Sequence, residues 1–444
     1  MIDFIDYEES REYKYKVLMW LNITQDKAEE DSGVFVAKKI LSVMTKARPD
    51  VYWVIVTRES TGLLSFPHST IIPYPFPKNP NSMRCHFLPF EVENILKEHD
   101  IDVIYSHVPE HTARLVNIVE NRTGLRPKVV GYEHWIELDE NDTRKQSTVM
   151  SNLSGVLAME ECGFNSQWQI DIFLREAEKN LSKQNVDKLR RIVKIHRLGT
   201  MFDNTPPESI ITKTLVFNHR ADGYTGWADL LKVLDELWKK RQDWRLRKTL
   251  DCEEERPYLT SLGKLDTTAY KQVLKQGVIG IGFFQKYSAW SLSVTDGFAC
   301  GLPYLLPNRY CYPEMVGAEY PLLYSTNEEF LVKLESALDI PTFRQDHEES
   351  IRSIIKRLPT WEQSILTWFD NWSFLEKDWI KFQKSETYPK IIAFIKHRGA
   401  GVTRKDLYRK FGWGSASVDY AYYRNMLRDD SRIKLAKNGY EFRG

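Results

Sequence analysis

Short apolar runs alternate with amphipathic segments along the first half of the chain. Residues 15–23 and 51–57 are apolar and of strand length, and residues 34–47 between them place apolar side chains at helical spacing. The alternation continues with predicted strands over 101–107, 127–134 and 153–160, and with predicted helices over 90–100, over 110–124 and from near Ser166. Such alternation predicts a parallel sheet covered on both faces, with its ligand site at the carboxyl ends of the strands.

A second alternating unit follows a stretch without periodicity. Residues 198–213 are rich in turn formers, so we place a domain boundary near residues 200–212. Beyond it the pattern predicts helices between about 327 and 384, helices over 227–241, 267–276 and 291–301, and strands over 214–220, 244–250, 278–284, 302–307 and 321–325. The predicted fold class is therefore α/β, with two Rossmann-like domains over residues 1–205 and 206–384.

The last segment, residues 385–444, has a different pattern. Three short amphipathic stretches, 387–399, 403–413 and 415–431, precede two short strands that flank the turn formers Asn438 and Gly439. Thr403 and Ser415 stand where helix N-caps belong. Three helices and a hairpin predict a small winged helix-turn-helix domain.

Charge is unevenly distributed between this segment and the rest. The net charge is +1, but residues 387–444 carry +8 and the preceding residues carry −7. A basic module on an otherwise acidic protein is typical of contact with phosphates, although a solvated basic surface is also common.

The remaining composition narrows the class of protein. The amino terminus has no basic start followed by an apolar stretch, and no apolar run reaches the ~20 residues that a membrane helix needs. The five cysteines are scattered and lack metal-ligand spacing. We expect a soluble cytoplasmic protein, in the host cytoplasm if a phage encodes it, with no membrane partner and no structural zinc.

The string SAWSLSVTDGFACGLPYLLPN, residues 288–308, is the most informative in the chain. It resembles the retaining glycosyltransferase superfamily of two facing Rossmann lobes (GT-B), whose pattern has two acids about eight positions apart before a similar turn. The resemblance implies that Asp296 binds the ribose of a nucleotide sugar. It places Ser288 where the first, sugar-contacting acid stands. The amides around Leu292 and Ser293, at a helix N-terminus, would donate to the diphosphate.

The string FNHRADGYTGW, residues 217–227, resembles the same family's basic pair. Arg220 matches the arginine, whose planar fork suits a phosphate. Thr225 stands where the family has a lysine, and Lys286 or Lys264 are the alternatives for that second charge. The resemblance implies a nucleoside diphosphate sugar as donor, most simply a UDP-sugar, and no obligatory metal.

Two strings in the first domain carry further candidates. Gly33, beside Ser32 at a helix start, permits close approach of a phosphate to the backbone. The string YEHWIELDEND, residues 132–142, resembles the T-even phage DNA alpha-glucosyltransferase, as does IYSHVPEHT, residues 104–112.

That resemblance makes His134 a group that orients the sugar or the acceptor. Glu133, Glu137 or the acidic cluster 29–31 would take the acceptor proton, unless the departing phosphate does so itself. His107 is either a further site residue or a strand-end histidine bonded to the backbone.

For the tail, the winged-helix prediction implies a recognition helix in the major groove of duplex DNA. Its candidate contacts are Arg404, Lys405, Ser415, Ser417, Tyr420, Tyr423, Arg424 and Lys437. Together with the glycosyltransferase resemblance, this predicts transfer of a sugar to a hydroxymethylated pyrimidine in duplex DNA. Two alternatives stay open: a glycosyltransferase for cell-surface or capsule polysaccharide, and a non-enzymatic DNA-binding regulator with a degenerate sugar-binding fold.

Overall fold

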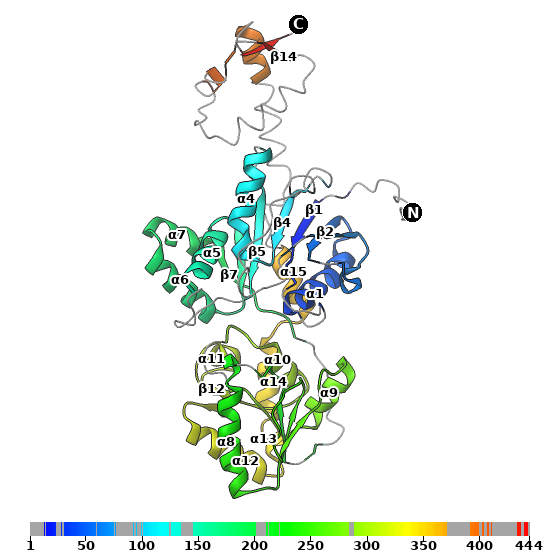
Figure 1. The fold of residues 1–444 in the computed structure, drawn as a ribbon, viewed down its shortest axis with the longest axis vertical. Coiled ribbons are helices and arrows are strands. Elements are labelled where there is room, and N and C mark those ends of the chain that lie inside the picture. Colours follow the sequence, from blue (N-terminus) through cyan, green and yellow to red (C-terminus); the bar gives the residue numbers. More distant parts are fainter. Residues whose placement is uncertain are drawn as a thin grey trace. The chain divides into compact units, whose positions relative to one another are not determined.

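The computed structural model describes most of both predicted Rossmann-like domains (Figure 1). The described ranges, apart from single positions and pairs between them, are residues 15–23, 31–58, 60–74, 101–123, 126–134, 145–200, 213–221, 223–283, 288–370, 391–398, 433–436 and 439–442.

The first sheet has the strand order β3-β2-β1-β4-β5-β6-β7, and its strands are β1 (Tyr15–Trp20), β2 (Val51–Thr57), β3 (Ser69–Pro73), β4 (Val103–Ser106), β5 (Lys128–Glu133), β6 (Glu161–Phe164) and β7 (Val193–Ile195). Strand β1 pairs in parallel with both β2 and β4. The helices of this part are α1 (Ser32–Ala47), the 3-10 turn η2 (Gly62–Leu64), α4 (Pro109–Thr123), α5 (Lys145–Leu157), α6 (Gln167–Asn180) and α7 (Lys183–Ile192). The order of the chain reverses between β1 and β4, which is where doubly wound sheets bind ligands.

One predicted strand is wrong. Residues 153–160 lie mostly in helix α5, which ends at Leu157, and the strand β6 begins only at Glu161. Val149, Leu153 and Val156 are buried at helical spacing, so the apolar run is the inner face of a helix. A Cβ on Gly155 would lie 1.8 Å from the carbonyl oxygen of Pro109, so this glycine lets α5 pack directly against backbone.

Three edge strands escaped the sequence analysis. Strands β3 and β7 are the two edges of the first sheet, and β10 is one edge of the second. The segment containing β3 is rich in proline, and Pro73 pairs with Thr57 at the end of the strand. An edge strand tolerates proline because one of its sides needs no hydrogen-bond donors.

The second sheet has the order β10-β9-β8-β11-β12-β13, built from β8 (Thr214–Phe217), β9 (Arg245–Lys248), β10 (Leu259–Ser261), β11 (Ile279–Ile281), β12 (Tyr304–Pro307) and β13 (Leu323–Tyr324). Its neighbouring strands all pair in parallel, as predicted. The helices are η3 (Gly223–Thr225), α8 (Trp227–Lys240), α9 (Thr267–Gln276), α10 (Leu292–Ala299), α11 (Tyr312–Val316), α12 (Asn327–Asp339), α13 (Phe343–Asp346), α14 (Glu348–Arg357) and α15 (Trp361–Asp370). The chain order reverses between β8 and β11, which defines the switch point of this sheet.

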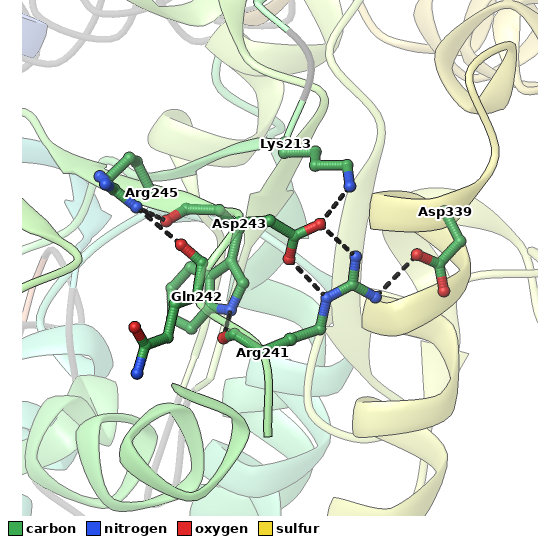
Figure 2. Close-up of polar contacts among 7 residues, drawn as sticks. Lys213, Arg241, Gln242, Asp243, Arg245 and Asp339 are labelled. Carbon is green, nitrogen blue, oxygen red and sulfur yellow. Dashed lines mark hydrogen bonds and ion pairs between the residues drawn. The ribbon is translucent and has the colours of Figure 1, made fainter. Parts of the chain in front are cut away.

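An ion-pair cluster holds the amino-terminal ends of β8 and β9 (Figure 2). The guanidinium of Arg241 bonds both carboxylate oxygens of Asp243, at 2.8 and 3.0 Å, and reaches Asp339 at the end of α12 at 2.7 Å. Lys213, next to β8, bonds the same carboxylate of Asp243. These cations hold the pKa of the Asp243 carboxyl well below its usual range.

A buried arginine closes the carboxyl ends of α9 and α10. Arg344 is 4% exposed. Its guanidinium donates to the carbonyl oxygens of Leu274, Lys275, Gly277, Cys300 and Gly301. The last carbonyls of a helix lack partners within it, so a cation here satisfies two helix ends at once. Burial lowers the pKa of Arg344 to about 10, which still leaves it charged at neutral pH.

The described parts of the tail agree with the predicted elements. Residues 391–398 are helical, and β14 (Ile433–Ala436) pairs antiparallel with β15 (Gly439–Phe442). Thr403 is an N-cap as predicted, because its hydroxyl accepts from the amide of Asp406 while the Asp406 carboxylate accepts from the amide of Thr403. Ser415 and the predicted recognition helix lie outside the described residues.

The chain divides into two compact units. One contains residues 1–132, 150–162 and 369–444, and the other contains residues 133–149 and 163–368. In the first, Phe369 packs edge-on against Trp53. In the second, Thr200 forms a bridge with Thr360. The domain limits 1–205, 206–384 and 385–444 stay predictions.

We expect Arg344→Met to lower the free energy of unfolding by about 3 kcal/mol or more, because it leaves several buried carbonyl groups without donors. Guanidinium denaturation followed by circular dichroism measures the change. Arg352→Met is the control, since Arg352 is 71% exposed and pairs only with Glu348 among the described contacts. Equal denaturation midpoints for the two variants would contradict the assignment.

Candidate functional site

The carboxyl end of β8 is joined to α10 through one buried amide. Asn218, which directly follows β8, donates from Nδ2 to the carbonyl oxygen of Ser293 at 2.8 Å and to the hydroxyl of Tyr270 at 2.9 Å. Its Oδ1 accepts from the Tyr304 hydroxyl at 2.9 Å. The Tyr270 hydroxyl in turn reaches Asp296 Oδ2 at 3.5 Å. The network thus positions the loop after β8 against the helix that carries Asp296.

Tyr304 fits this network because two glycines leave room for its ring. A Cβ on Gly280 would lie 2.4 Å from the ring, and a Cβ on Gly297 would lie 2.3 Å from its hydroxyl oxygen. Burial raises the pKa of the hydroxyls of Tyr304 and Tyr270 well above the ordinary value, so both stay protonated donors. Gly280 and Gly297 therefore have a packing role.

The loop after β8 presents Arg220 and closes on itself. Arg220 is exposed, whereas Thr225 is 1% exposed and its hydroxyl donates to the carbonyl oxygen of Arg220 at 2.8 Å. Gly226, at φ 70°, adopts the left-handed conformation that precedes α8 and that glycine permits. Thr225 therefore braces the loop from within, and its hydroxyl is turned to the backbone.

A buried lysine lies behind the same loop. Lys248, the last residue of β9, is fully buried, and its ammonium donates to the carbonyl oxygens of His219, Leu250 and Asp251. His219 is 5% exposed. Burial, together with the charge of Lys248, lowers the pKa of His219 to about 3, so its ring is neutral at physiological pH.

The start of α10 has the features expected of an anion site. The side chain of Ser291 accepts from the amide of Val294, and its carbonyl accepts from Thr295. Among the described residues, the amides of Leu292 and Ser293 have no hydrogen-bond acceptor. Free amides at a helix start attract a phosphate. The structure thus brings the predicted residues of α10 to the same edge of the sheet as the loop of Arg220.

The position of the family's first acid is part of the core. Ser288 is 4% exposed, and its hydroxyl bonds the hydroxyl of Tyr312 at 3.2 Å and lies 3.6 Å from the sulfur of Cys311. Burial raises the pKa of the Cys311 thiol to about 12. Of the two alternatives for a second cation, Lys264 is exposed, and Lys286 lies outside the described residues.

In the first sheet, the amide of Gly33 is already bonded. Asp31 is the N-cap of α1, and its carboxylate accepts from the amides of Gly33 and Val34 at 2.8 and 3.2 Å. The approach of a phosphate to Gly33 would therefore have to displace the Asp31 side chain. Asp31 itself, one of the candidate bases, is 4% exposed and serves as a helix cap.

Glu133 is the last residue of strand β5 and His134 directly follows it, one residue beyond the end of the strand, and the two differ in exposure. Glu133 is fully buried, whereas His134 is half-buried. Gln169, at the start of α6, donates to the carbonyl oxygen of Glu133 at 3.1 Å. His107 is 6% exposed, and its amide donates to the carbonyl oxygen of Trp20. His134 is thus the more accessible of these two candidates at the end of β5.

Several predicted site residues lie outside the part of the chain that the structure describes. They are Glu29, Glu30, Glu137, Arg404, Lys405, Ser415, Ser417, Tyr420, Tyr423, Arg424 and Lys437. Within the described residues no cluster of three or more His, Cys, Asp or Glu side chains is arranged to hold a metal ion. No helix in the same residues is long and apolar enough to cross a membrane.

Sequence analysis overlooked Asn218, Tyr270, Tyr304 and Lys248. A polar residue directly after a buried strand, as in FNHR, is a signal that could have identified Asn218. Lys248 ends a short strand of mixed polarity, and its burial depends on carbonyl groups from two loops. The local sequence pattern does not predict contacts of this kind.

The sequence matches no protein-family model, and no curated protein matches it. Solved structures do resemble the chain. A glycosyltransferase from Rickettsia africae has a TM-score of 0.60 at 13% identity, covering 82% of this chain and 99% of that one. HepE of Anabaena, in a structure with UDP and glucose, has a TM-score of 0.61 at 11% identity and covers 81% of this chain and 99% of its own.

The lipopolysaccharide outer core galactosyltransferase WaaB has a TM-score of 0.56 at 11% identity, covering 80% of this chain and 98% of its own. At such identities the likeness concerns the fold. It confirms the predicted fold class, two Rossmann-like domains of the GT-B type.

The histidine beside Arg220 predicts sensitivity to acid. His219 is neutral in the folded protein down to pH near 3, whereas an unfolded histidine binds a proton below pH about 6.5. Its contribution to stability is therefore lost as pH falls from about 6.5 toward 3. At pH 5 the loss is about 2 kcal/mol relative to pH 8.

Denaturant unfolding of the wild type and of His219→Leu at both pH values tests this. We expect the variant to lose about 2 kcal/mol less between pH 8 and 5 than the wild type. His196→Leu is a parallel case, since burial lowers the pKa of His196 to about 3 as well. Identical pH dependence in wild type and His219→Leu would rule out a neutral buried histidine.

Proposed function

We propose that this chain is a glycosyltransferase that uses a nucleoside diphosphate sugar, with UDP-sugar as the expected donor. The observation that carries the proposal is the joining of Arg220 and the start of α10 at one edge of the second sheet, through the side chain of Asn218. An exposed guanidinium and free helix amides together suit a diphosphate. The likeness to HepE, whose structure contains UDP and glucose, supports the same donor class.

In the proposed reaction the bond between the anomeric carbon and the β-phosphate oxygen breaks, and a bond to the acceptor oxygen forms. Arg220 and the amides of Leu292 and Ser293 stabilise the charge that develops on the departing diphosphate. Asp296 accepts hydrogen bonds from the ribose hydroxyls. His134 orients the transferred sugar. The acceptor proton moves to an oxygen of the departing phosphate; Glu133, one of the candidate carboxylate bases, is fully buried.

As acceptor we propose a hydroxymethylated pyrimidine in duplex DNA. The support is the segregation of +8 charge in residues 387–444, together with the helix, the N-cap and the hairpin described in that segment. Neutralising phosphates with such a surface gives salt-sensitive binding of low sequence specificity, which suits an enzyme that acts at many sites on DNA.

A second candidate acceptor is a cell-surface polysaccharide. The likeness to WaaB, a lipopolysaccharide galactosyltransferase, favours it. In that case the basic tail binds another partner. The two candidates share the donor site and differ only in what the tail and the first domain recognise.

For the donor site we expect Arg220→Met to weaken UDP binding at least tenfold, which corresponds to about 1.4 kcal/mol. Uridine binding should stay unchanged, since uridine has no phosphate. Asp296→Asn should weaken the binding of UDP and of uridine by the same factor. Isothermal titration calorimetry measures the affinity of each variant for UDP and for uridine, with Arg352→Met as the control. UDP affinity equal to wild type in Arg220→Met would refute the site.

For the acceptor we expect hexose or pentose on DNA when the protein is mixed with a panel of nucleotide sugars and a hydroxymethylated duplex. Mass spectrometry of the released nucleosides measures transfer, and an unmodified duplex is the control. Transfer only to glycans would favour the polysaccharide acceptor. Duplex binding without any turnover would instead favour a DNA-binding regulator.

A further inference from the structure

One buried side chain contacts the backbone before the Arg220 loop and an aromatic ring after it. The ammonium of Lys248 donates to the carbonyl oxygen of His219, one residue before Arg220, at 3.2 Å. It also lies 5.6 Å from the ring centre of Trp227, the first residue of α8. Lys248 thus contacts the residue that precedes the loop and the residue that follows it.

All of the hydrogen-bonding capacity of this ammonium goes to backbone. Its other two bonds reach the carbonyl oxygens of Leu250 at 2.9 Å and Asp251 at 3.2 Å, in the loop after β9. An ammonium group has three donors, so these three bonds use them all. Burial lowers the pKa of Lys248, because desolvation disfavours the charged ammonium. A purely apolar contact would need no such cation.

Arg220 itself has a long exposed side chain whose position depends on its backbone. The hydroxyl of Thr225 holds the Arg220 carbonyl from the far side of the loop at 2.8 Å. The backbone of Arg220 is thus held between the bond of Lys248 to His219 and the bond of Thr225. A guanidinium that must meet a phosphate gains affinity when its backbone is ordered before binding.

We propose that Lys248 is a positioning residue for the diphosphate, which orders the loop of Arg220 by bonding its backbone from inside the domain. This role rests on the proposed function, since it acts through Arg220. Lys248 touches neither donor nor acceptor and is not a catalytic residue.

The same two strands provide a matched control. At the amino-terminal ends of β8 and β9, Arg241 forms the ion-pair cluster with Asp243 and Asp339 (Figure 2). Arg241→Met removes a cation that bonds Asp243, just before β9, and Asp339 at the end of α12, at the amino-terminal edge of the sheet. It therefore reports the effect of loosening the sheet without touching the Arg220 loop.

The experiment measures UDP and uridine binding by calorimetry in wild type, Lys248→Met, Arg241→Met and Arg220→Met, at a temperature where circular dichroism shows each to be folded. We expect Lys248→Met to weaken UDP binding about tenfold while uridine binding changes less than twofold. Arg241→Met should leave both unchanged. The double variant Lys248→Met/Arg220→Met should bind UDP no more weakly than Arg220→Met alone, because the two residues act as one unit.

Hydrogen exchange of the free protein gives a readout that needs no ligand. Amides of residues 219–226 should exchange faster in Lys248→Met and at the wild-type rate in Arg241→Met. If Lys248→Met does not fold, Thr225→Val replaces it, since this change removes only the hydroxyl that holds the loop from its other side. We expect Thr225→Val to show the same changes in UDP affinity, uridine affinity and amide exchange rates.

The outcomes separate the two proposals. A wild type that binds no nucleoside diphosphate overturns the proposed function and this role with it. The role of Lys248 alone is overturned if the wild type binds UDP, Arg220→Met binds it more weakly and Lys248→Met binds it as the wild type does. The role is also overturned if the factors by which the two single variants weaken UDP binding multiply in the double variant. It is overturned as well if Lys248→Met weakens uridine and UDP binding by the same factor, because this shows a general effect on the domain.

Discussion

The position of Asn218 at the end of β8 is the constraint from which the candidate site follows. Its amide serves as donor to Ser293 and Tyr270 and as acceptor from Tyr304, so it joins a strand, two helices and the neighbouring region of β12. Neither a carboxylate nor an apolar side chain provides donors and an acceptor together. The loop of Arg220 and the start of α10 therefore depend on one side chain for their common location. The buried setting makes each of these bonds costly to lose.

Two buried cations bond irregular backbone elsewhere in the second domain. Lys248 bonds carbonyl groups of the loops after β8 and β9, and Arg344 bonds those at the ends of α9 and α10. In both cases the cation satisfies backbone oxygens that secondary structure leaves over. Lys248 does so at the carboxyl ends of the strands, beside the candidate site, and Arg344 does so at the amino ends, ahead of β11 and β12. A site that must recognise a diphosphate with few charged side chains benefits from the order that Lys248 gives to its loop.

The departures from the glycosyltransferase pattern have a consistent physical character. Ser288, in place of an acid, belongs to a buried cluster with Cys311 and Tyr312. Thr225, in place of a lysine, bonds the backbone of Arg220. Both side chains bond other parts of the domain, so the proposed binding of the donor rests on Arg220, Asp296 and helix amides. The leaving group would then meet a single arginine side chain among the described residues of this loop.

The sequence by itself determined the α/β class and most of the central strands of both sheets, because apolar runs of strand length alternate with helical periodicity along both halves of the chain. It also indicated Arg220 and Asp296, which lie in recognisable strings at strand and helix ends. It could not determine the secondary structure of residues 153–160, where an apolar run fits either a strand or a buried helix. Only the packing around Gly155 selects the helix. Only the tertiary structure identified Asn218, Tyr304 and Lys248, because their partners come from segments up to 86 residues away in the chain. Hydrogen bonds between such distant groups leave no periodic trace in the sequence that forms them.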